Sequence, residues 1–293
     1  VTWSPDRNWV ASSSNDKTVR IWPLVGNAQK DPFMYTGHTG KVLAVAWSPN
    51  SAYIASASQD KTVRVYNTSY SKRGKPGQAL FIYKEQSSTS EISALAWSPD
   101  SKRIASTSIG EKLQVWDAET GKHSMYYIDP IQQGPAPASG PANAVAWSPD
   151  GRSIVSSIAN VSVWNVASGV RLAYSGHGYI VVHGLAWSPD SKYIASAGED
   201  KTVQVWNAAT MILVFTYKGH TAAVYTVSWS PDGKYLASGG ADKTVQVWDA
   251  VTGKPLFTYR GHTAPVNAVA WSSDGKHIAS GGDDRKVLVW QGA

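Results

Sequence analysis

The chain repeats one four-residue word, Trp-Ser-Pro-Asp, seven times with little variation. The word begins at 40- to 50-residue intervals, at Trp3, Trp47, Trp97, Trp147, Trp187, Trp229 and Trp271. Only positions 50 and 273 depart from it, with Asn and Ser. Self-similarity at this period is typical of proteins built from repeated supersecondary units. We therefore expect residues 1–293 to form one repeat domain.

Composition and charge narrow the range of functions. The 293 residues include no Cys, which excludes disulfides, thiolate metal sites and thiol nucleophiles. The net charge of +6 is divided equally between residues 1–150 and 151–293, and the densest basic cluster is the short segment 72–75. This even distribution does not favour nucleic-acid binding. No apolar run approaches the ~20 residues of a membrane helix, so we expect a cytoplasmic protein without membrane contact.

A single repeat, residues 219–261, has the pattern of four short β-strands. Residues 224–229 and 234–238 are rich in strand formers, residues 243–248 alternate polar and apolar, and residues 255–259 form a fourth segment. Residues 230–233 are a turn in which Pro presets φ and Gly supplies a positive φ. Because no segment has a helical period, the repeats predict an all-β fold of four-stranded antiparallel units arranged radially.

Two further motifs recur in most repeats. Several repeats begin with Gly-His, and all close on a word that ends the third predicted strand: IWP (21–23), VYN (65–67), VWD (115–117), VWN (163–165), VWN (205–207), VWD (247–249) and VWQ (289–291). In these motifs the chain resembles the WD-repeat β-propeller family over nearly its whole length. The near-identical units, such as DKTVQVW at 200–206 and 242–248, resemble those of bacterial members.

The resemblance implies a fold class and its boundaries. It implies an all-β, seven-bladed β-propeller of four-stranded antiparallel blades, in which the last blade lacks its outer strand. The expected blades span about 1–37, 38–86, 87–130, 141–176, 177–219, 220–261 and 262–293.

Four repeats carry a His, a Ser and an Asp at matching positions. These are the residue types of a nucleophilic triad, but an enzyme has no use for four copies of one triad. The resemblance implies instead a buried structural tetrad in which Asp, His, Ser and a third-strand aromatic residue are linked. The expected tetrads are His38, Ser56, Asp60, Tyr66; His177, Ser196, Asp200, Trp206; His220, Ser238, Asp242, Trp248; and His262, Ser280, Asp284, Trp290.

The other repeats support this interpretation. The third repeat has Ser88 and Gly110 at the His and Asp positions, and the fourth has Ala138 at the His position. Joint loss is expected of paired buried groups, because one partner left alone costs ~1–3 kcal/mol. A metal site from His177 and His183 lacks a third ligand. We therefore predict no catalytic residue, no metal and no cofactor.

The resemblance also indicates where a partner would bind. In the family, the top rim around the central channel commonly binds proteins or peptides. The corresponding candidate residues are Leu43, Ser93, Asn143, Tyr179, His183, Glu199, Tyr225, Asn267 and Asp283. The alternative is that exposed loop positions simply vary.

We expect a non-catalytic protein–protein interaction scaffold that binds a protein or peptide on this rim. An alternative is a regulatory or sensory domain of a larger multidomain enzyme, since bacterial members are often tethered to a catalytic domain. Nucleic-acid binding is a lesser alternative that a steep salt dependence would reveal.

The two ends of the chain suggest an incomplete last blade. After Trp290 only three residues remain, while Asp16 is retained without a preceding Gly-His. We expect the natural chain to extend N-terminally by about a strand and a Gly-His link that pairs with residues 286–290.

Overall fold

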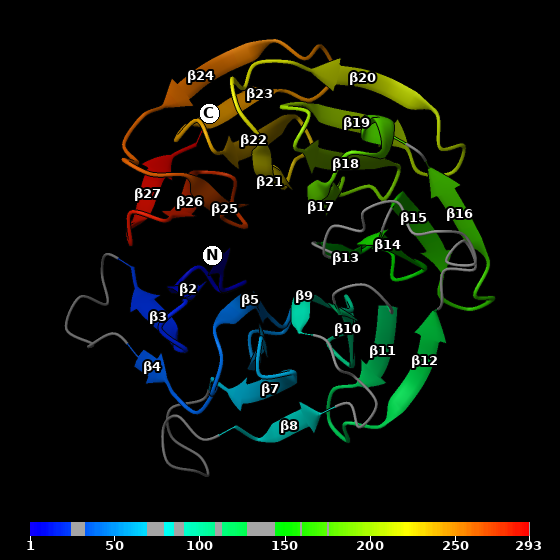
Figure 1. The fold of residues 1–293 in the computed structure, drawn as a ribbon, viewed down its shortest axis with the longest axis vertical. Coiled ribbons are helices and arrows are strands. Elements are labelled where there is room, and N and C mark those ends of the chain that lie inside the picture. The colour runs from blue at the N-terminus through cyan, green and yellow to red at the C-terminus, as the bar shows by residue number, and fades with distance from the viewer. Residues whose placement is uncertain are drawn as a thin grey trace. The chain divides into compact units, whose positions relative to one another are not determined.

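A computed structural model describes residues 1–24, 33–68, 79–84, 91–108, 113–127, 144–158, 160–174 and 176–292 (Figure 1). Within these residues the regular structure is β-strand, apart from a short 3-10 segment at Gly176–Tyr179. The chain forms two compact units, one of residues 2–145 and one of residue 1 with residues 146–293. The expectation of a single domain stays a prediction.

The unit of residues 2–145 holds three four-stranded sheets in which spatial order follows chain order. The first contains β1 (Thr2–Trp3), β2 (Trp9–Ser13), β3 (Val19–Pro23) and β4 (Phe33–Tyr35). The second contains β5 (Val42–Trp47), β6 (Tyr53–Ser58), β7 (Thr62–Asn67) and β8 (Phe81–Lys84). The third contains β9 (Ile92–Trp97), β10 (Arg103–Ser108), β11 (Leu113–Asp117) and β12 (His123–Tyr127).

The fourth sheet begins at the boundary between the units and contains β13 (Val145–Trp147), β14 (Ser153–Ile158), β15 (Asn160–Asn165) and β16 (Arg171–Tyr174). The fifth contains β17 (Val182–Trp187), β18 (Tyr193–Gly198), β19 (Val203–Asn207) and β20 (Leu213–Tyr217). The sixth contains β21 (Val224–Trp229), β22 (Tyr235–Gly240), β23 (Val245–Asp249) and β24 (Pro255–Tyr259). The last has three strands, β25 (Val266–Trp271), β26 (His277–Gly282) and β27 (Val287–Gln291).

The predicted fold class, an all-β seven-bladed β-propeller, is confirmed, with six four-stranded antiparallel blades and a last blade of three strands. In the reference repeat, the predicted strands at 224–229 and 255–259 have the observed bounds. The strand predicted at 234–238 is observed as β22, which begins at Tyr235 and continues to Gly240. A Cβ at that position would collide with the carbonyl oxygen of Ala223, so this glycine permits a close strand approach.

Consecutive blades of one unit bury their faces against each other. Between the fifth and sixth blades, Val203 and Tyr217 pack in one cluster with Leu236 and Trp248. The rings of Tyr217 and Trp248 are stacked with centroids 4.5 Å apart. Such aromatic pairs contribute about 0.5–1.5 kcal/mol beyond the area that they bury. A blade therefore completes its core with side chains of the next blade, as expected of a repeat protein.

The repeated Trp-Ser-Pro-Asp word builds the same turn in every blade. In the sixth blade Ser230 Oγ donates to Asp232 Oδ1 at 2.6 Å, and it accepts the backbone N–H of Tyr235 at 2.9 Å. The aspartate oxygen also accepts the N–H of Lys234 at 3.1 Å. Gly233 has the predicted positive φ, 72°. The turn is therefore held by its own side chains, which explains why the word recurs.

Serine replaces this glycine in other blades and adopts the same backbone conformation. The φ angles of Ser101 and Ser191 are 62° and 61°, a region that disfavours residues with a Cβ. Both hydroxyls accept a backbone N–H from the turn of the preceding blade, Ser101 from Asn50 and Ser191 from Asp150, at 3.1 Å in each case. These hydrogen bonds between blades offset the backbone strain.

Candidate functional site

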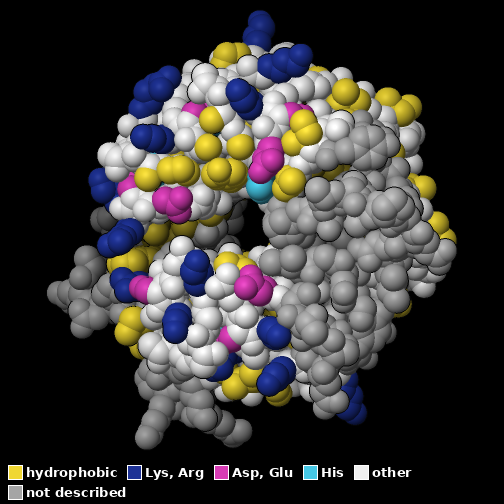
Figure 2. Space-filling view, viewed as in Figure 1, with side chains coloured by type: hydrophobic (Ala, Val, Ile, Leu, Met, Phe, Trp, Pro, Cys, Tyr) yellow, Lys and Arg dark blue, Asp and Glu magenta, His cyan; other side chains and the backbone are white. Residues whose placement is uncertain are grey.

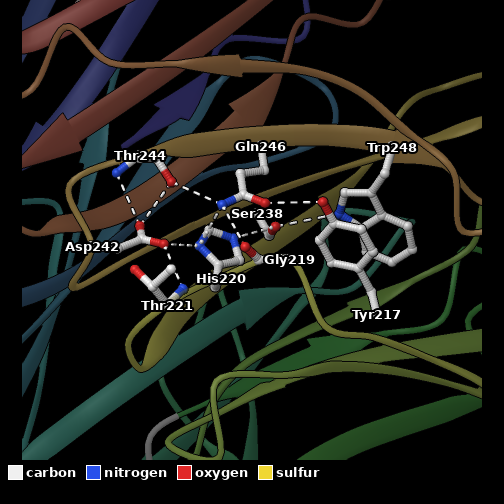
Figure 3. Close-up of polar contacts among 9 residues, drawn as sticks. All are labelled: Tyr217, Gly219, His220, Thr221, Ser238, Asp242, Thr244, Gln246 and Trp248. Atoms are coloured by element: carbon white, nitrogen blue, oxygen red, sulfur yellow. Dashed lines mark hydrogen bonds and ion pairs between the residues drawn. The ribbon is translucent and has the colours of Figure 1, made fainter.

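The His, Ser and Asp of the sixth blade lie in one buried chain of hydrogen bonds (Figure 3). His220 Nδ1 lies 2.8 Å from Asp242 Oδ2, and its Nε2 lies 2.8 Å from Ser238 Oγ. The indole N–H of Trp248 donates to the same Ser238 oxygen at 3.3 Å. Because a carboxylate only accepts, Nδ1 carries the proton, and Nε2 accepts from the serine hydroxyl. With this assignment, both ring nitrogens of His220, the Ser238 hydroxyl and the Trp248 indole N–H each have a hydrogen-bond partner.

The structure brings the same residue types together in the other three sets. The His–Asp distance is 2.8 Å for His38 and His177 and 2.9 Å for His262, and the His–Ser distance is 2.8 Å in all three. The indoles of Trp206 and Trp290 donate to their serines at 2.9 and 2.7 Å.

The second blade differs at its aromatic member. Tyr66 is fully buried beside Ser56, but its hydroxyl meets no atom in hydrogen-bond geometry within the described part of the chain. The network of this blade therefore ends at the serine.

The distances in each set match those of a catalytic triad, so burial has to decide between the two roles. The Ser238 side chain is 0% exposed and His220 is 6% exposed. The serine oxygen also accepts the indole N–H of Trp248, whose side chain is itself fully buried, so the hydroxyl is not open to solvent. This environment favours a structural role over nucleophilic catalysis.

Burial and hydrogen bonding shift the pKa values of His38, His177 and Asp60. Burial lowers the pKa of His38 and His177 more than the neighbouring aspartates raise it, so both imidazoles are neutral near pH 7. Burial opposes the charge on Asp60, but hydrogen bonds from Thr62, the Thr39 N–H and His38 outweigh it and lower the pKa of that carboxyl. The His38–Asp60 pair is thus a neutral imidazole beside a carboxylate.

The sequence reasoning missed the residues that complete this network. Thr244 Oγ1 donates to Asp242 at 2.8 Å, and Gln246 Nε2 donates to Thr244 at 3.1 Å. The hydroxyl of Tyr217 donates to Gln246 Oε1 at 2.9 Å (Figure 3). The sequence feature that could have indicated these two residues is the repeated string DKTVQVW, which contains both the Thr and the Gln.

Some predicted positions lie outside the described residues. These are Ser88, Gly110, Ala138 and Asn143, together with the side chain of Tyr179.

The remaining rim candidates on first strands share one backbone feature. In the sixth blade Val224 pairs with Gly240 and Thr226 with Gly239, so Tyr225 is an extra residue without a partner in the ladder. The same register shift occurs at Leu43, Ser93, His183 and Asn267. Bulges bend a strand and redirect a side chain, and they are frequent beside binding sites.

In the unit that contains residues 146–293, the rim side chains form two polar pairs. His183 Nε2 lies 3.3 Å from Glu199 Oε1, and the His183 ring meets the ring of Tyr225 edge to face at 5.1 Å. Asn267 Nδ2 donates to Asp283 Oδ1 at 2.5 Å. The Glu199 side chain is 51% exposed. Acceptor oxygens and an aromatic ring are therefore available on this rim.

In the unit of residues 2–145, the described rim positions are Leu43 and Ser93. Leu43 and Ser93 are half-buried, and Ser93 Oγ donates to the Thr107 carbonyl at 3.3 Å. Gln59 Nε2 donates to Glu91 Oε2 at 3.1 Å.

The basic side chains do not gather on the coloured part of the face in Figure 2. The lysines and arginines there lie apart and are interspersed with acidic and uncharged residues (Figure 2). This dispersion gives no basic stripe for a phosphate backbone to follow.

Neither a metal-binding cluster nor a membrane-spanning helix occurs among the described residues. These residues contain no group of three His, Asp or Glu side chains placed to hold a metal ion. Both ring nitrogens of His177 are engaged by Asp200 and Ser196. In the described ranges, no helix has the length and apolar character needed to cross a membrane.

Comparison with protein families agrees with the geometry. The family model described as "WD domain, G-beta repeat" matches residues 1–23, 30–67, 77–117, 170–207, 211–249 and 253–291. The chain belongs to the WD40 family. Each later WD40 match runs from the fourth strand of one blade to the third strand of the next, as 211–249 does from β20 to β23. No curated protein is matched by the chain.

The longest unmatched segment of this WD40 chain, residues 118–169, contains most of the fourth blade. It also contains the His position occupied by Ala138. Of the third and fourth blades, which both lack the His motif, only the fourth falls mostly outside the matched segments.

Proposed function

We propose that this WD40 chain is a non-catalytic interaction scaffold that binds a protein or peptide partner on the rim formed by the bulged first-strand residues. WD40 propellers generally mediate protein–protein interaction. Two sets of residues serve stability and recognition separately. The networks hold each blade, and the rim side chains differ from blade to blade.

The observation that carries the proposal is a backbone bulge that recurs in five blades and presents a different side chain in each. The described bulge positions hold Leu, Ser, His, Tyr and Asn on the same local geometry. A surface of this kind supports recognition, because a constant backbone displays a variable set of contacts. Tyr225 is the strongest candidate anchor, since tyrosines are frequent among residues that dominate binding energy.

The test has two stages. A partner captured by pull-down and identified by mass spectrometry is purified, and its affinity is measured for the wild type, Glu199→Lys and Tyr225→Ala. We expect each variant to bind at least about tenfold more weakly, which corresponds to about 1.4 kcal/mol. The control is Lys192→Glu in a Ser-Pro-Asp turn, where the lysine side chain is 71% exposed. Unchanged binding by both rim variants, or a larger loss in the control, would contradict the proposal.

A further inference from the structure

The fifth and seventh blades carry a matching pair of side chains at the rim. One member lies at the bulge of the first strand, and the other directly precedes the turn aspartate. The pair is His183 and Glu199 in the fifth blade, and Asn267 and Asp283 in the seventh. The polar atoms of each pair meet, at 3.3 and 2.5 Å respectively. These two positions of a blade therefore lie close enough for their side chains to interact.

The sixth blade, which lies between them in the chain, lacks this polar contact. Its pair is Tyr225 and Ala241, and the alanine side chain has no polar atom. Within the described residues, the hydroxyl of Tyr225 has no hydrogen-bond partner. The ring is half-buried and meets the His183 ring edge to face, with centroids 5.1 Å apart. This geometry leaves at least one face of the tyrosine ring uncovered by the histidine.

Glu199 carries a charge that no basic side chain balances. Its side chain is 51% exposed, and it lies 3.3 Å from His183. Burial lowers the pKa of His183 more than Glu199 raises it, so this imidazole is neutral near pH 7. No Lys or Arg of the described ranges forms an ion pair with Glu199. The rim thus presents an uncompensated carboxylate beside an aromatic ring, since His183 contacts both.

Apolar surface adjoins these two groups. The loops of the sixth and seventh blades hold the half-buried Ala223, Ala241 and Ala264. The backbone N–H of Ala241 donates to the Ala223 carbonyl at 2.8 Å, which joins the loops before β21 and after β22. In the upper part of Figure 2, hydrophobic side chains form a row between acidic ones, and one acidic side chain lies against a histidine (Figure 2). The complementary group therefore has a positive charge and an apolar stem.

An arginine side chain meets these requirements better than a lysine. Its guanidinium is planar and permanently charged, and it both stacks on aromatic rings and donates two parallel N–H groups to a carboxylate. The lysine ammonium is a compact and strongly hydrated point charge that cannot do both. The aliphatic stem of arginine covers apolar surface while its head remains polar.

We propose that this rim recognises an arginine side chain of the partner, with the guanidinium paired to the Glu199 carboxylate and stacked on the Tyr225 ring. Ala241 makes the site possible, because its small side chain leaves the ring accessible where the neighbouring blades place an acidic residue. This inference rests on the proposed function and deepens it, since it states the chemistry of the partner.

The probes for the test are short peptides selected from a random displayed library on the full-length chain. We expect the recovered peptides to be enriched in arginine. Replacing that arginine with citrulline, which has a similar shape but no charge, should raise the dissociation constant at least about tenfold, as measured by fluorescence polarisation. The same loss is expected for Glu199→Gln and for Tyr225→Ala with the arginine peptide. Circular dichroism verifies that both variants remain folded.

A double-substitution cycle identifies the contact. Citrulline should cost less than about threefold in the Glu199→Gln variant, because the carboxylate that it no longer pairs with is already absent. Tyr225→Phe retains the ring and should bind the arginine peptide within about threefold of the wild type. The matched control is Glu119→Gln, which removes one charge from an exposed glutamate in the turn between β11 and β12 and should leave binding unchanged.

Two results would overturn the proposal, and they differ in what else they overturn. Selected peptides that are weakened by Tyr225→Ala but unaffected by both citrulline and Glu199→Gln would keep the rim as the binding surface and exclude arginine recognition. Peptides that bind both rim variants as tightly as the wild type would contradict the proposed function as well.

Discussion

Each of the four buried histidines uses both ring nitrogens. In the sixth blade His220 is held between Asp242 and Ser238, and the aspartate also accepts the N–H of Thr221 at 3.1 Å. An unsatisfied buried polar group costs about 1–3 kcal/mol, so a complete network keeps a buried imidazole compatible with a stable blade. The His–Asp and His–Ser distances resemble those of a catalytic triad, but here the serine is buried and closed to solvent.

At this scale we predict that His220→Ala and Asp242→Ala each lower the free energy of unfolding by about 1–3 kcal/mol, because each leaves a buried partner unsatisfied. The double variant should cost much less than the sum, since the orphaned partner is removed as well. Urea unfolding of all four proteins measures the coupling. Additive losses would show that the two residues do not act as a pair.

Among the elements, the Ser-Pro-Asp turn needs an acceptor oxygen rather than a charge. The second blade has Asn50 in place of the aspartate, and Ser48 Oγ donates to Asn50 Oδ1 at 2.7 Å. The Asn50 oxygen also accepts the N–H of Ala52 at 3.0 Å. The carboxylate geometry of the other turns is thus reproduced by a neutral amide.

We therefore predict that Asp232→Asn changes the free energy of unfolding by less than about 0.5 kcal/mol, whereas Asp232→Ala lowers it by about 1 kcal/mol through the lost hydrogen bonds. Thermal and urea unfolding of the two variants provide the comparison. Equal destabilisation by Asn and Ala would mean that the charge itself holds the turn.

For the whole molecule, the buried histidines link stability to pH. His38 and His177 have pKa values lowered from 6.5 by burial. Below about pH 6.5 the unfolded chain binds protons at these residues that the folded chain does not bind. The free energy of unfolding must therefore fall as the pH drops below about 6.5. Asp60 and Asp284, whose pKa values are lowered from 3.8, add a further loss only as the pH falls toward and below about 3.8.

The prediction is a progressive loss of stability in urea unfolding between pH 7.5 and pH 5. His177→Gln should reduce the slope of this loss, because one of the titrating groups is gone. An unfolding free energy that is constant or rises toward pH 5 would refute the linkage.

The number of blades, the strands at 224–229 and 255–259 and the positive φ of Gly233 were all predictable from the sequence. Each rests on a local pattern, because residue alternation and turn chemistry act over a few neighbouring positions. The candidate tetrads were also found from recurrence, together with the family resemblance. The prediction of the strand at 234–238 was less accurate at its end, since β22 continues to Gly240 and strand ends depend on cross-strand contacts.

The tertiary structure alone decided the bulge at Tyr225, the contact of its ring with His183 and the burial that separates a tetrad from a triad. It also decided that the hydroxyl of Tyr66 takes no part in its blade's network within the described residues. These features depend on strand register and on packing between blades, which join residues about 40 positions apart. A local sequence pattern does not encode such contacts, because the free energy that selects them arises only when the blades pack together.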